Sequence, residues 1–388
     1  MKKQLLSTSA IAIGVVAMGA PALAQDWDMT WGGYHTSHVG LVDVSTNTAA
    51  HAGADFDGVD VYTEAEIHFT PSITLDNGMT FGVTVEYEST TNGGGTVDES
   101  YMTISSDTLG RIVLGNANSV GYNMMVSAPQ LDGSIWINSP SLSGFIPISI
   151  SAGGNLPWNF RQAGISAYTE VLGNDDVARI SYYTPSFNGL TLGVSYAAAD
   201  NILGGGVNAG NNFGVNRNAG VNDIFDIAVA YSQSFNGVDI NAAARWGTAS
   251  NDTGIAGTSD PEVWNIGATI GVAGFTFGGS YQENDNGNLI PDEEGWALGA
   301  TYDIPGPWSI GIDTYQGEMK GTGAGAGDKA EYEAYQIIGN REIGPGVSWS
   351  IYAVHAEGSV NADAGGTFGN PNTSVEGTLI GTSVNLSF

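Results

Sequence analysis

The chain has 388 residues, no cysteine, 57 glycines and a formal net charge of -30, from 10 basic and 40 acidic side chains. This charge excludes nucleic-acid binding, which needs a basic surface to displace phosphate counterions, and the lack of thiols excludes a disulfide-stapled fold. A hydrophobic fraction of 42% with only 13% charged residues is too apolar for a disordered acidic chain. The chain therefore folds, and its length permits one large barrel or two to three smaller domains.

Residues 1–24 have the pattern of a secretory signal peptide. Lys2 and Lys3 form a positive end, residues 11–20 form an apolar centre, and residues 22–24 form a small-residue cleavage site. The apolar run is too short for a membrane anchor, which needs about 20 apolar residues. We therefore expect export and cleavage near Ala24.

The rest of the chain alternates between apolar and polar residues. From Val59 to Ile73 the odd positions are mostly apolar and the even positions are mostly polar or acidic. This alternation predicts extended strands with one apolar and one polar face. No later stretch approaches the apolar length of a membrane-spanning helix. The same alternation recurs at residues 79–87, 225–231, 238–246, 264–270 and 296–302.

The chemistry of the two faces favours a membrane barrel over a soluble sandwich. The polar faces carry Gly, Ser, Thr, Asn and acids with hardly any lysine, unlike the mixed-charge surface of a soluble protein. The apolar faces end repeatedly in Trp, Tyr or Phe, which is typical of aromatic girdles at two lipid interfaces. We expect the apolar faces to contact lipid and the polar faces to line a water-filled lumen.

Short turns and long loops alternate along the chain. Turn chemistry marks seven short connections, at residues 75–78, 106–110, 185–189, 235–237, 271–274, 304–307 and 343–346. Polar segments mark eight long loops, at residues 43–58, 89–98, 116–175, 198–222, 247–262, 282–294, 316–330 and 356–376. These connections predict an all-β fold, a transmembrane antiparallel β-barrel of sixteen strands. A barrel of this size leaves an aqueous channel.

The third loop, residues 116–175, is by far the longest. A structureless segment of this length usually has a function. We expect it to fold into the barrel and narrow the channel, with a short helical turn within residues 115–125. The alternative is a hidden extra hairpin, because residues 139–145 repeat the pattern of residues 184–190. That hairpin would raise the strand count to eighteen.

Several segments form a recognisable series along the chain: the opening residues 31–34, the turn 75–78 with residues 81–82, the strand 110–115, the pair 180–185 and 189–196, and the closing residues 381–388. Taken in this order, they resemble a known family, the general-diffusion porins of Gram-negative outer membranes of the alpha-proteobacterial type. The resemblance covers essentially the whole mature chain, so residues 25–388 are expected to form one porin domain.

The resemblance implies a location in the outer membrane, with lipids and lipopolysaccharide as surroundings, and a homotrimer that passes small hydrophilic solutes passively. It also implies a constriction where acids of the third loop face basic residues of the wall, and makes the terminal strand with Phe388 an insertion signal. Nothing in it implies an enzyme.

Strand phase selects the side chains that are expected to line the pore. They are Glu64, Glu66, Glu86, Arg111, Arg179, Asp226, Asp239, Arg245 and Asp313 on the wall, with Asp132 from the third loop. Acidic side chains in a narrow pore favour cations, and low-dielectric walls focus their field. We therefore predict cation selectivity. The alternative places most acids at the loop rims, where they bind divalent ions between lipid headgroups and leave the pore nearly neutral.

Other chemistry has weaker support. Glu64, Glu66 and His68 share one strand face and are candidate metal ligands, although a hydrated lumen also explains them. Residues 282–293 partly match a calcium loop, but they join strands rather than helices. We expect no cofactor beyond calcium held weakly by acidic loops. The competing function is an exported acidic Gly/Asn-rich surface protein or adhesin without a pore.

Overall fold

The computed structural model describes residues 26–48, 51–89, 95–137, 142, 144–148, 170–199, 215, 217–321, 327–361 and 373–388. The predicted signal peptide lies outside these residues. Almost all of the described chain is antiparallel β-structure. The strands are β1 (Trp31–Thr46), β2 (Gly58–Phe69), β3 (Ser72–Thr74), β4 (Thr80–Glu88), β5 (Thr96–Ser106), β6 (Gly110–Ala117), β7 (Val177–Tyr183), β8 (Leu190–Ala199), β9 (Val221–Phe235), β10 (Val238–Asn251), β11 (Glu262–Val272), β12 (Phe275–Asp285), β13 (Asp292–Asp303), β14 (Trp308–Lys320), β15 (Lys329–Gly344), β16 (Val347–Asn361) and β17 (Thr373–Ser387).

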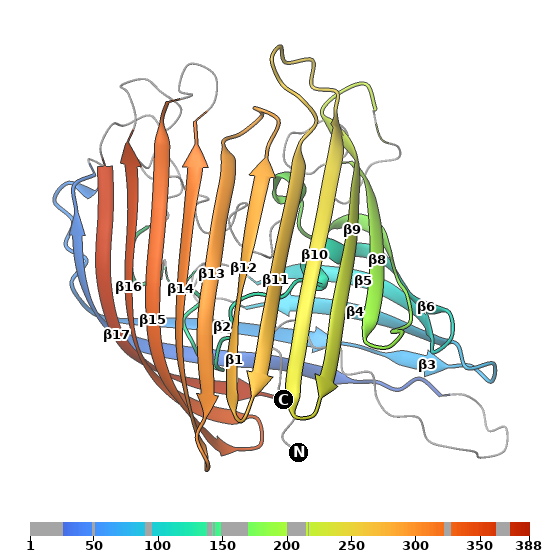
Figure 1. Cartoon of the computed structure of the whole chain (residues 1–388), viewed down its shortest axis with the longest axis horizontal. Helices are drawn as coiled ribbons and strands as arrows, with labels where there is room; N and C mark the ends of the chain where they lie inside the picture. The colour runs from blue at the N-terminus through green and yellow to red at the C-terminus, as the bar shows by residue number, and fades with distance from the viewer. Residues whose placement is uncertain are drawn as a thin grey trace.

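These strands form one closed barrel (Figure 1). Each strand pairs with its neighbours in sequence, and β1 also pairs with β17. β2 and β3 both pair with β4 and are separated at Pro71, which has no N–H to donate to a ladder. The two segments therefore make one strand of the wall, and the barrel has sixteen strands, as predicted.

The connections follow the predicted order. Seven short turns lie at one end of the barrel and the long loops lie at the other, and the C-terminus lies near the turn end (Figure 1). In the turn between β9 and β10, Asn236 and Gly237 have φ values of 50° and 82°. Two positive φ values define the type I′ turn, whose twist matches that of the paired strands. The strands reach further into most of the predicted loops than expected, and the loop from β10 to β11, for example, spans only residues 252–261.

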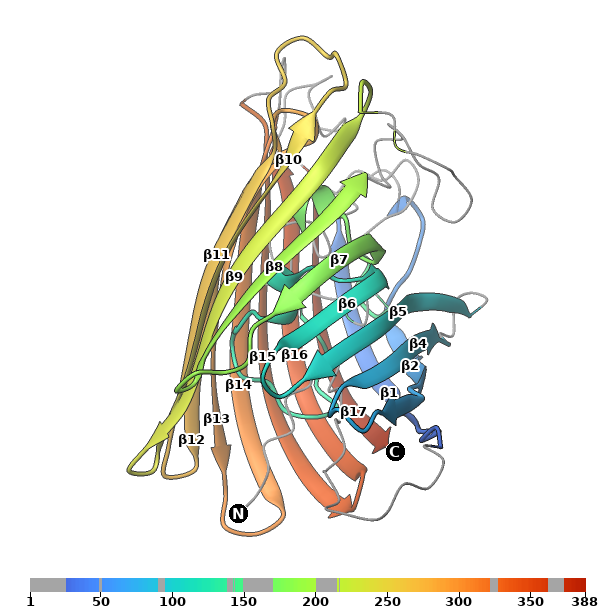
Figure 2. The ribbon, with the colours of Figure 1, turned by 90° about the vertical axis from the view of Figure 1, so that its right-hand side faces the viewer.

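The wall is taller on one side than on the other. β15 has 16 residues and β9 has 15, whereas β6 has eight and β7 has seven. Figure 2 shows the short strands β4–β7 in front of the tall ones. β6 pairs directly with β7, so the long segment between them adds no strand to the wall, and the alternative of eighteen strands is wrong.

The outer face carries the predicted apolar stripes. Ile266, Ile312 and Ile337 are each more than half exposed, as expected for side chains that contact lipid rather than a protein core. Aromatic rings pair at both ends of the stripes: Trp264 contacts Tyr281 near the loops, and Phe275 contacts Tyr302 near the turns. These rings form the two interfacial girdles typical of outer-membrane barrels.

The third loop fills part of the barrel interior. Its predicted helical turn is α1 (Val120–Asn123), where Ser119 caps the helix by accepting a hydrogen bond from the Tyr122 N–H. A second short helix, η2 (Val171–Gly173), precedes β7. The buried apolar side chains that the loop contributes to the largest core cluster are Ile135, Ile137, Leu142, Phe145, Ile146 and Ile148. They pack on inward-facing side chains of β13–β17, β1 and β2.

The inner face is therefore not polar throughout, as the sequence interpretation assumed. On β15 the inward positions Ala330, Tyr332 and Ala334 are apolar, whereas the outward positions Glu331 and Glu333 are acidic. This reversal lies at the loop end of the strand. There the outer face is charged and unsuited to contact with hydrocarbon, and the inner face is covered by the third loop. Alternation shows that a strand has one apolar and one polar face, but it does not show which of the two faces the lumen.

Candidate pore site

Acidic side chains gather on the inner face of β2 and β4. Val61 and Ile67 of β2 are exposed on the outer face. Since successive side chains of a strand point to opposite faces, Glu64 and Glu66 point inward. Glu86 and Glu88 of β4 share this inner face, and in the strand register Glu88 lies opposite Glu66. Glu66 is 9% exposed and Glu86 is 4% exposed, so both carboxylates are close to the wall.

A β-bulge adds two more acids to this group. The register between β4 and β5 shifts between Val85 and Tyr87, which leaves Asp98 and Glu99 together opposite Glu86. Bulges of this kind redirect side chains near functional sites. Glu99 accepts hydrogen bonds from the N–H and the side-chain amide of Asn118, at 2.9 and 2.7 Å, and so fixes the start of the third loop.

The end of the third loop brings Asp176 to the same place. Burial and the neighbouring carboxylates of Asp98, Glu99 and Asp175 raise the pKa of Asp176 to about 10. Asp176 also has a positive φ of 45°, a conformation in which Asp and Asn are favoured over other non-glycine residues. We name the inward group Glu64, Glu66, Glu86, Glu88, Asp98, Glu99 and Asp176 the acidic wall.

Within the described residues, the carboxylates of Glu66, Glu86 and Asp98 form no ion pair with a lysine or an arginine. The ion pair found here joins Glu66 to His68 of the same strand, 3.1 Å apart. No ion pair with a lysine or an arginine in the described part of the chain therefore offsets these three side chains.

Two of the three predicted wall arginines, Arg179 and Arg245, lie in a different, buried cluster. Arg245 Nη2 lies 2.5 Å from Asp226 Oδ1 and 3.6 Å from Glu170 Oε2. Arg179 lies 3.9 Å from both acids. All four side chains are at most 5% exposed. Two positive and two negative charges balance, so this cluster adds little net field to the lumen.

α1 packs directly on this cluster. A Cβ at Gly121 would lie 2.3 Å from Arg245 Nε, so only glycine lets the helix approach the guanidinium so closely. Glu170 accepts a hydrogen bond from the Ser119 N–H at 2.6 Å. The cluster thereby ties both ends of the third loop to β7, β9 and β10.

The third-loop acid that meets the wall arginines is Glu170, which the sequence interpretation missed in favour of Asp132. Asp132 lies against β15 and β16, where its backbone carbonyl accepts hydrogen bonds from Asn340 and Ser350, and its side chain is exposed. Glu170 sits in irregular chain, where no periodicity gives its direction. Its nearness to the start of β7 was the available signal.

The other predicted pore residues are spread along the barrel. Asp313 accepts hydrogen bonds from Gln130 of the third loop and Gln336 of β15, so it anchors the loop. Arg111 stacks over the ring of Tyr183, with its Cζ 4.3 Å from the ring centre. Asp239 is exposed beside the turn from β9 to β10 and accepts a hydrogen bond from Ser234, so the structure does not join it to the acidic wall.

A second group of acids lies outside the barrel near its loop end. Its members include Glu283, Glu294, Glu318, Glu331, Glu333 and Glu357, and five of them line a shallow outer hollow. Lys320 pairs with Glu294, and Lys329 pairs with Glu318 and Glu331. Acids thus occupy both places that the sequence left open, the lumen and the rim.

The calcium-loop pattern at residues 282–293 is divided between two paired strands. In the register of β12 and β13, Asn284 lies opposite Glu293. Asn286 donates to the Pro291 carbonyl and so closes the short connection itself. This arrangement is a β-hairpin with inward polar side chains and differs from the single loop that surrounds calcium in a helix–loop–helix site.

Within the described residues, no helix is long and apolar enough to cross a membrane.

Three comparisons with known proteins bear on this geometry. A family model described as Gram-negative porin matches residues 7–363. A search of curated proteins gives no match. Among solved structures, the anion-selective porin from Comamonas acidovorans aligns with a TM-score of 0.57 at 16% identity, over 94% of this chain and all of that one.

Two further structures show the same fold. The outer-membrane protein OmpT of Vibrio cholerae, in its trimer form, aligns with a TM-score of 0.56 at 10% identity, over 93% of this chain and 99% of that one. A mutant of the Rh. blastica porin aligns with a TM-score of 0.51 at 14% identity, over 93% of this chain and 100% of that one. The family match and the closed sixteen-stranded barrel together show that the chain belongs to the Gram-negative porins, the passive channels of the outer membrane.

Proposed function

We propose that this porin is a cation-selective channel for small hydrophilic solutes and ions. The observation that carries the proposal is the uneven pairing of lumen charges. Arg179 and Arg245 are buried and balanced by Glu170 and Asp226. No ion pair found among the described residues joins Glu66, Glu86 or Asp98 of the acidic wall to an arginine or a lysine. Low-dielectric walls focus the field of these acids into the lumen and raise the local concentration of cations.

The relatives do not decide this preference. The Comamonas acidovorans porin is anion-selective, yet it has the same fold. Selectivity in a water-filled barrel is set by the lumen charges, which differ between chains that share so little sequence. The alternative of an adhesin without a pore is wrong, because the family match and the closed barrel identify a channel.

Two further parts of the proposal concern the whole assembly. The third loop narrows the channel, a role supported by its apolar packing on the inner wall. The porin is a homotrimer in contact with outer-membrane lipid and lipopolysaccharide, an arrangement supported by the trimeric form of the Vibrio cholerae relative. The outer acids near the loop end have the charge needed to hold divalent ions between lipid headgroups.

The test is the zero-current potential of the purified full-length porin in a planar bilayer that separates concentrated from dilute KCl. The expected sign is that of potassium diffusing faster than chloride. The preference should weaken as both solutions are made more concentrated, because the Debye length falls from about 30 Å at 0.01 M to about 3 Å at 1 M. A zero potential, or one of the opposite sign, would contradict the proposal.

A further inference from the structure

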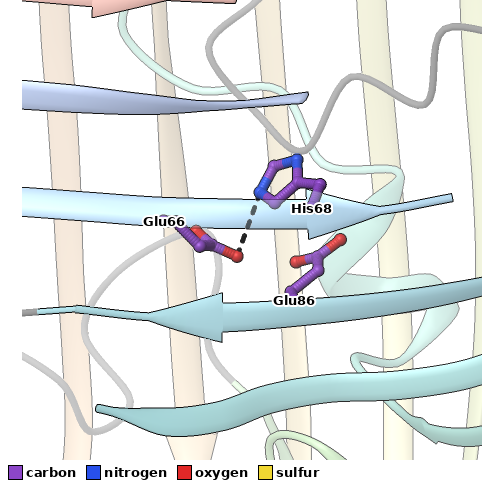
Figure 3. A group of neighbouring side chains, drawn as sticks. All are labelled: Glu66, His68 and Glu86. Atoms are coloured by element: carbon purple, nitrogen blue, oxygen red, sulfur yellow. Dashed lines mark ion pairs between the residues drawn. The ribbon is translucent and has the colours of Figure 1, made fainter. Parts of the chain in front are cut away.

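Glu66, His68 and Glu86 meet on the inner face of the barrel (Figure 3). Glu66 and His68 are two residues apart on β2, so their side chains share one face. Glu86 of β4 is the register partner of His68. Figure 3 shows the ion pair between His68 and Glu66 on β2, with the carboxylate of Glu86 projecting from β4 towards them.

The distances suit the coordination of a metal ion. One ligand atom from each residue lies within 4.8 Å of the other two. Glu66 Oε1 and His68 Nε2 are already 3.1 Å apart. Tetrahedral ligands at about 2.0–2.1 Å from zinc are separated from each other by about 3.3 Å. Small side-chain rotations therefore bring all three atoms to binding distance without moving a strand.

Two buried atoms of this group contact each other. Glu66 is 9% exposed, and its Oε1 is paired with His68 Nε2, 3.1 Å away. Neither atom makes a hydrogen bond to any other described residue. Two buried carboxylates side by side repel each other unless a positive charge lies between them. A divalent cation supplies that charge and takes both atoms as ligands in place of their contact with each other.

We propose that Glu66, His68 and Glu86 form a binding site for a zinc-class divalent cation on the lumen wall. Imidazole nitrogen with carboxylate oxygen is a donor set that suits zinc and neighbouring transition metals. Calcium instead takes six to eight oxygen ligands. The His68 side chain is 23% exposed, so the site opens on the lumen, which admits the ion and supplies water for the fourth position.

The structure corrects one member of the ligand set suggested by the sequence. Glu64 lies on the same strand face but outside the group whose ligand atoms converge, and Glu86 from β4 takes its place. The site is a fixed place on the wall, distinct from the passage of ions through the lumen. It stands whether or not the channel prefers cations.

The first measurement is zinc binding to the whole porin in detergent after metal removal, by calorimetry with ZnCl₂. We expect one zinc per chain in the wild type. His68→Gln and Glu86→Gln should each lower the affinity about tenfold or more, because each removes one of three ligands. His355→Gln is the matched control, since His355 also faces a glutamate, Glu376 at 3.8 Å, but on the outer face and outside the group.

X-ray absorption at the zinc edge gives a second readout that does not depend on affinity. One nitrogen and several oxygen ligands at about 2.0–2.1 Å are expected. Heat-modified gel migration checks that each variant has folded. Absence of zinc binding in the wild type, equal affinity in His68→Gln, or a spectrum with oxygen ligands alone would overturn the proposal. None of these results would decide the sign of the zero-current potential, so the two proposals fail separately.

Discussion

Arg245 illustrates how burial changes the role of a lumen charge. The alternation of inward and outward side chains along the strand places Arg245 inward. From the sequence alone it is therefore expected to face permeating ions. In the structure its Nη2 atom contacts Asp226 and Glu170, and the residue is 4% exposed. Charges removed from water in this way stabilise the fold only as a balanced set.

Arg245→Gln should therefore destabilise the barrel. The change leaves Asp226 and Glu170 with one arginine between them, and breaking a buried ion pair costs about 3–5 kcal/mol. The free energy of unfolding in urea measures this cost. Arg341→Gln is the control, because Arg341 is exposed and stacks over Trp308 at 5.6 Å, a contact worth about 0.5–1 kcal/mol. Equal losses in the two variants would contradict the structural role of the cluster.

Asp176 makes the acidic wall sensitive to pH. Its pKa of about 10 means that the carboxyl is protonated at pH 7 and ionises as the pH approaches 10. Asp176→Asn should match the wild type in zero-current potential at pH 7. Between pH 7 and 10 the wild type should gain cation preference that the variant does not gain. The same change in both proteins would show that Asp176 does not titrate in the lumen.

Raising the pH is expected to increase the cation preference through Asp176 but to lower the stability of the fold. Its folded-state pKa of about 10 lies above the value of about 3.9 expected in the unfolded chain. The folded state therefore holds an extra proton between these values. Its contribution to the free energy of unfolding falls as the pH rises through this window.

At the scale of elements, the strands and the short helical turn α1 were predictable, and the packing of the rest of the third loop was not. Alternation of apolar and polar residues is a local signal, and so are turn pairs such as Asn236–Gly237; both predicted their elements correctly. The loop is held by contacts between residues far apart in sequence, such as Gln336 with the backbone of Ile135. No spacing rule reports such contacts, so Phe145 and Ile146 carried no sequence signal for their positions, and Glu170 carried only its nearness to β7.

The third loop lies tightly against the wall at Gly267 of β11. A Cβ there would lie 1.7 Å from the carbonyl oxygen of Val126, well inside any real contact. Gly267→Ala should push the loop backbone away from the wall into the lumen and lower the single-channel conductance. Gly339→Ala on β15 is the control, because its Cβ would meet nothing nearer than 3.8 Å. Unchanged conductance in Gly267→Ala would contradict a loop that lies in the current path.

For the whole molecule, the sequence was sufficient for the barrel but not for the distribution of its charge. Strand phase predicts that Glu66 and Glu86 point inward, and in the structure they are 9% and 4% exposed. It did not show that Arg179 and Arg245 are balanced, nor that a bulge adds Asp98 and Glu99 to the same wall. It also left lumen and rim as alternatives for the acids, and the structure places carboxylates in both.

The central claim is that the acids inside the barrel, rather than the net charge of the chain, set its ion preference. Two triple variants separate these causes because each removes three carboxyl groups. One carries Glu64→Gln, Glu88→Gln and Asp98→Asn on the acidic wall. The other carries Glu283→Gln, Glu333→Gln and Glu357→Gln on the outer face near the loops.

The deciding measurement is the zero-current potential of both triple variants in the same KCl gradient at low salt. The account predicts that the inner variant loses much of the wild-type cation preference and that the outer variant keeps it. Equal changes in the two variants, or a larger change in the outer one, would contradict it.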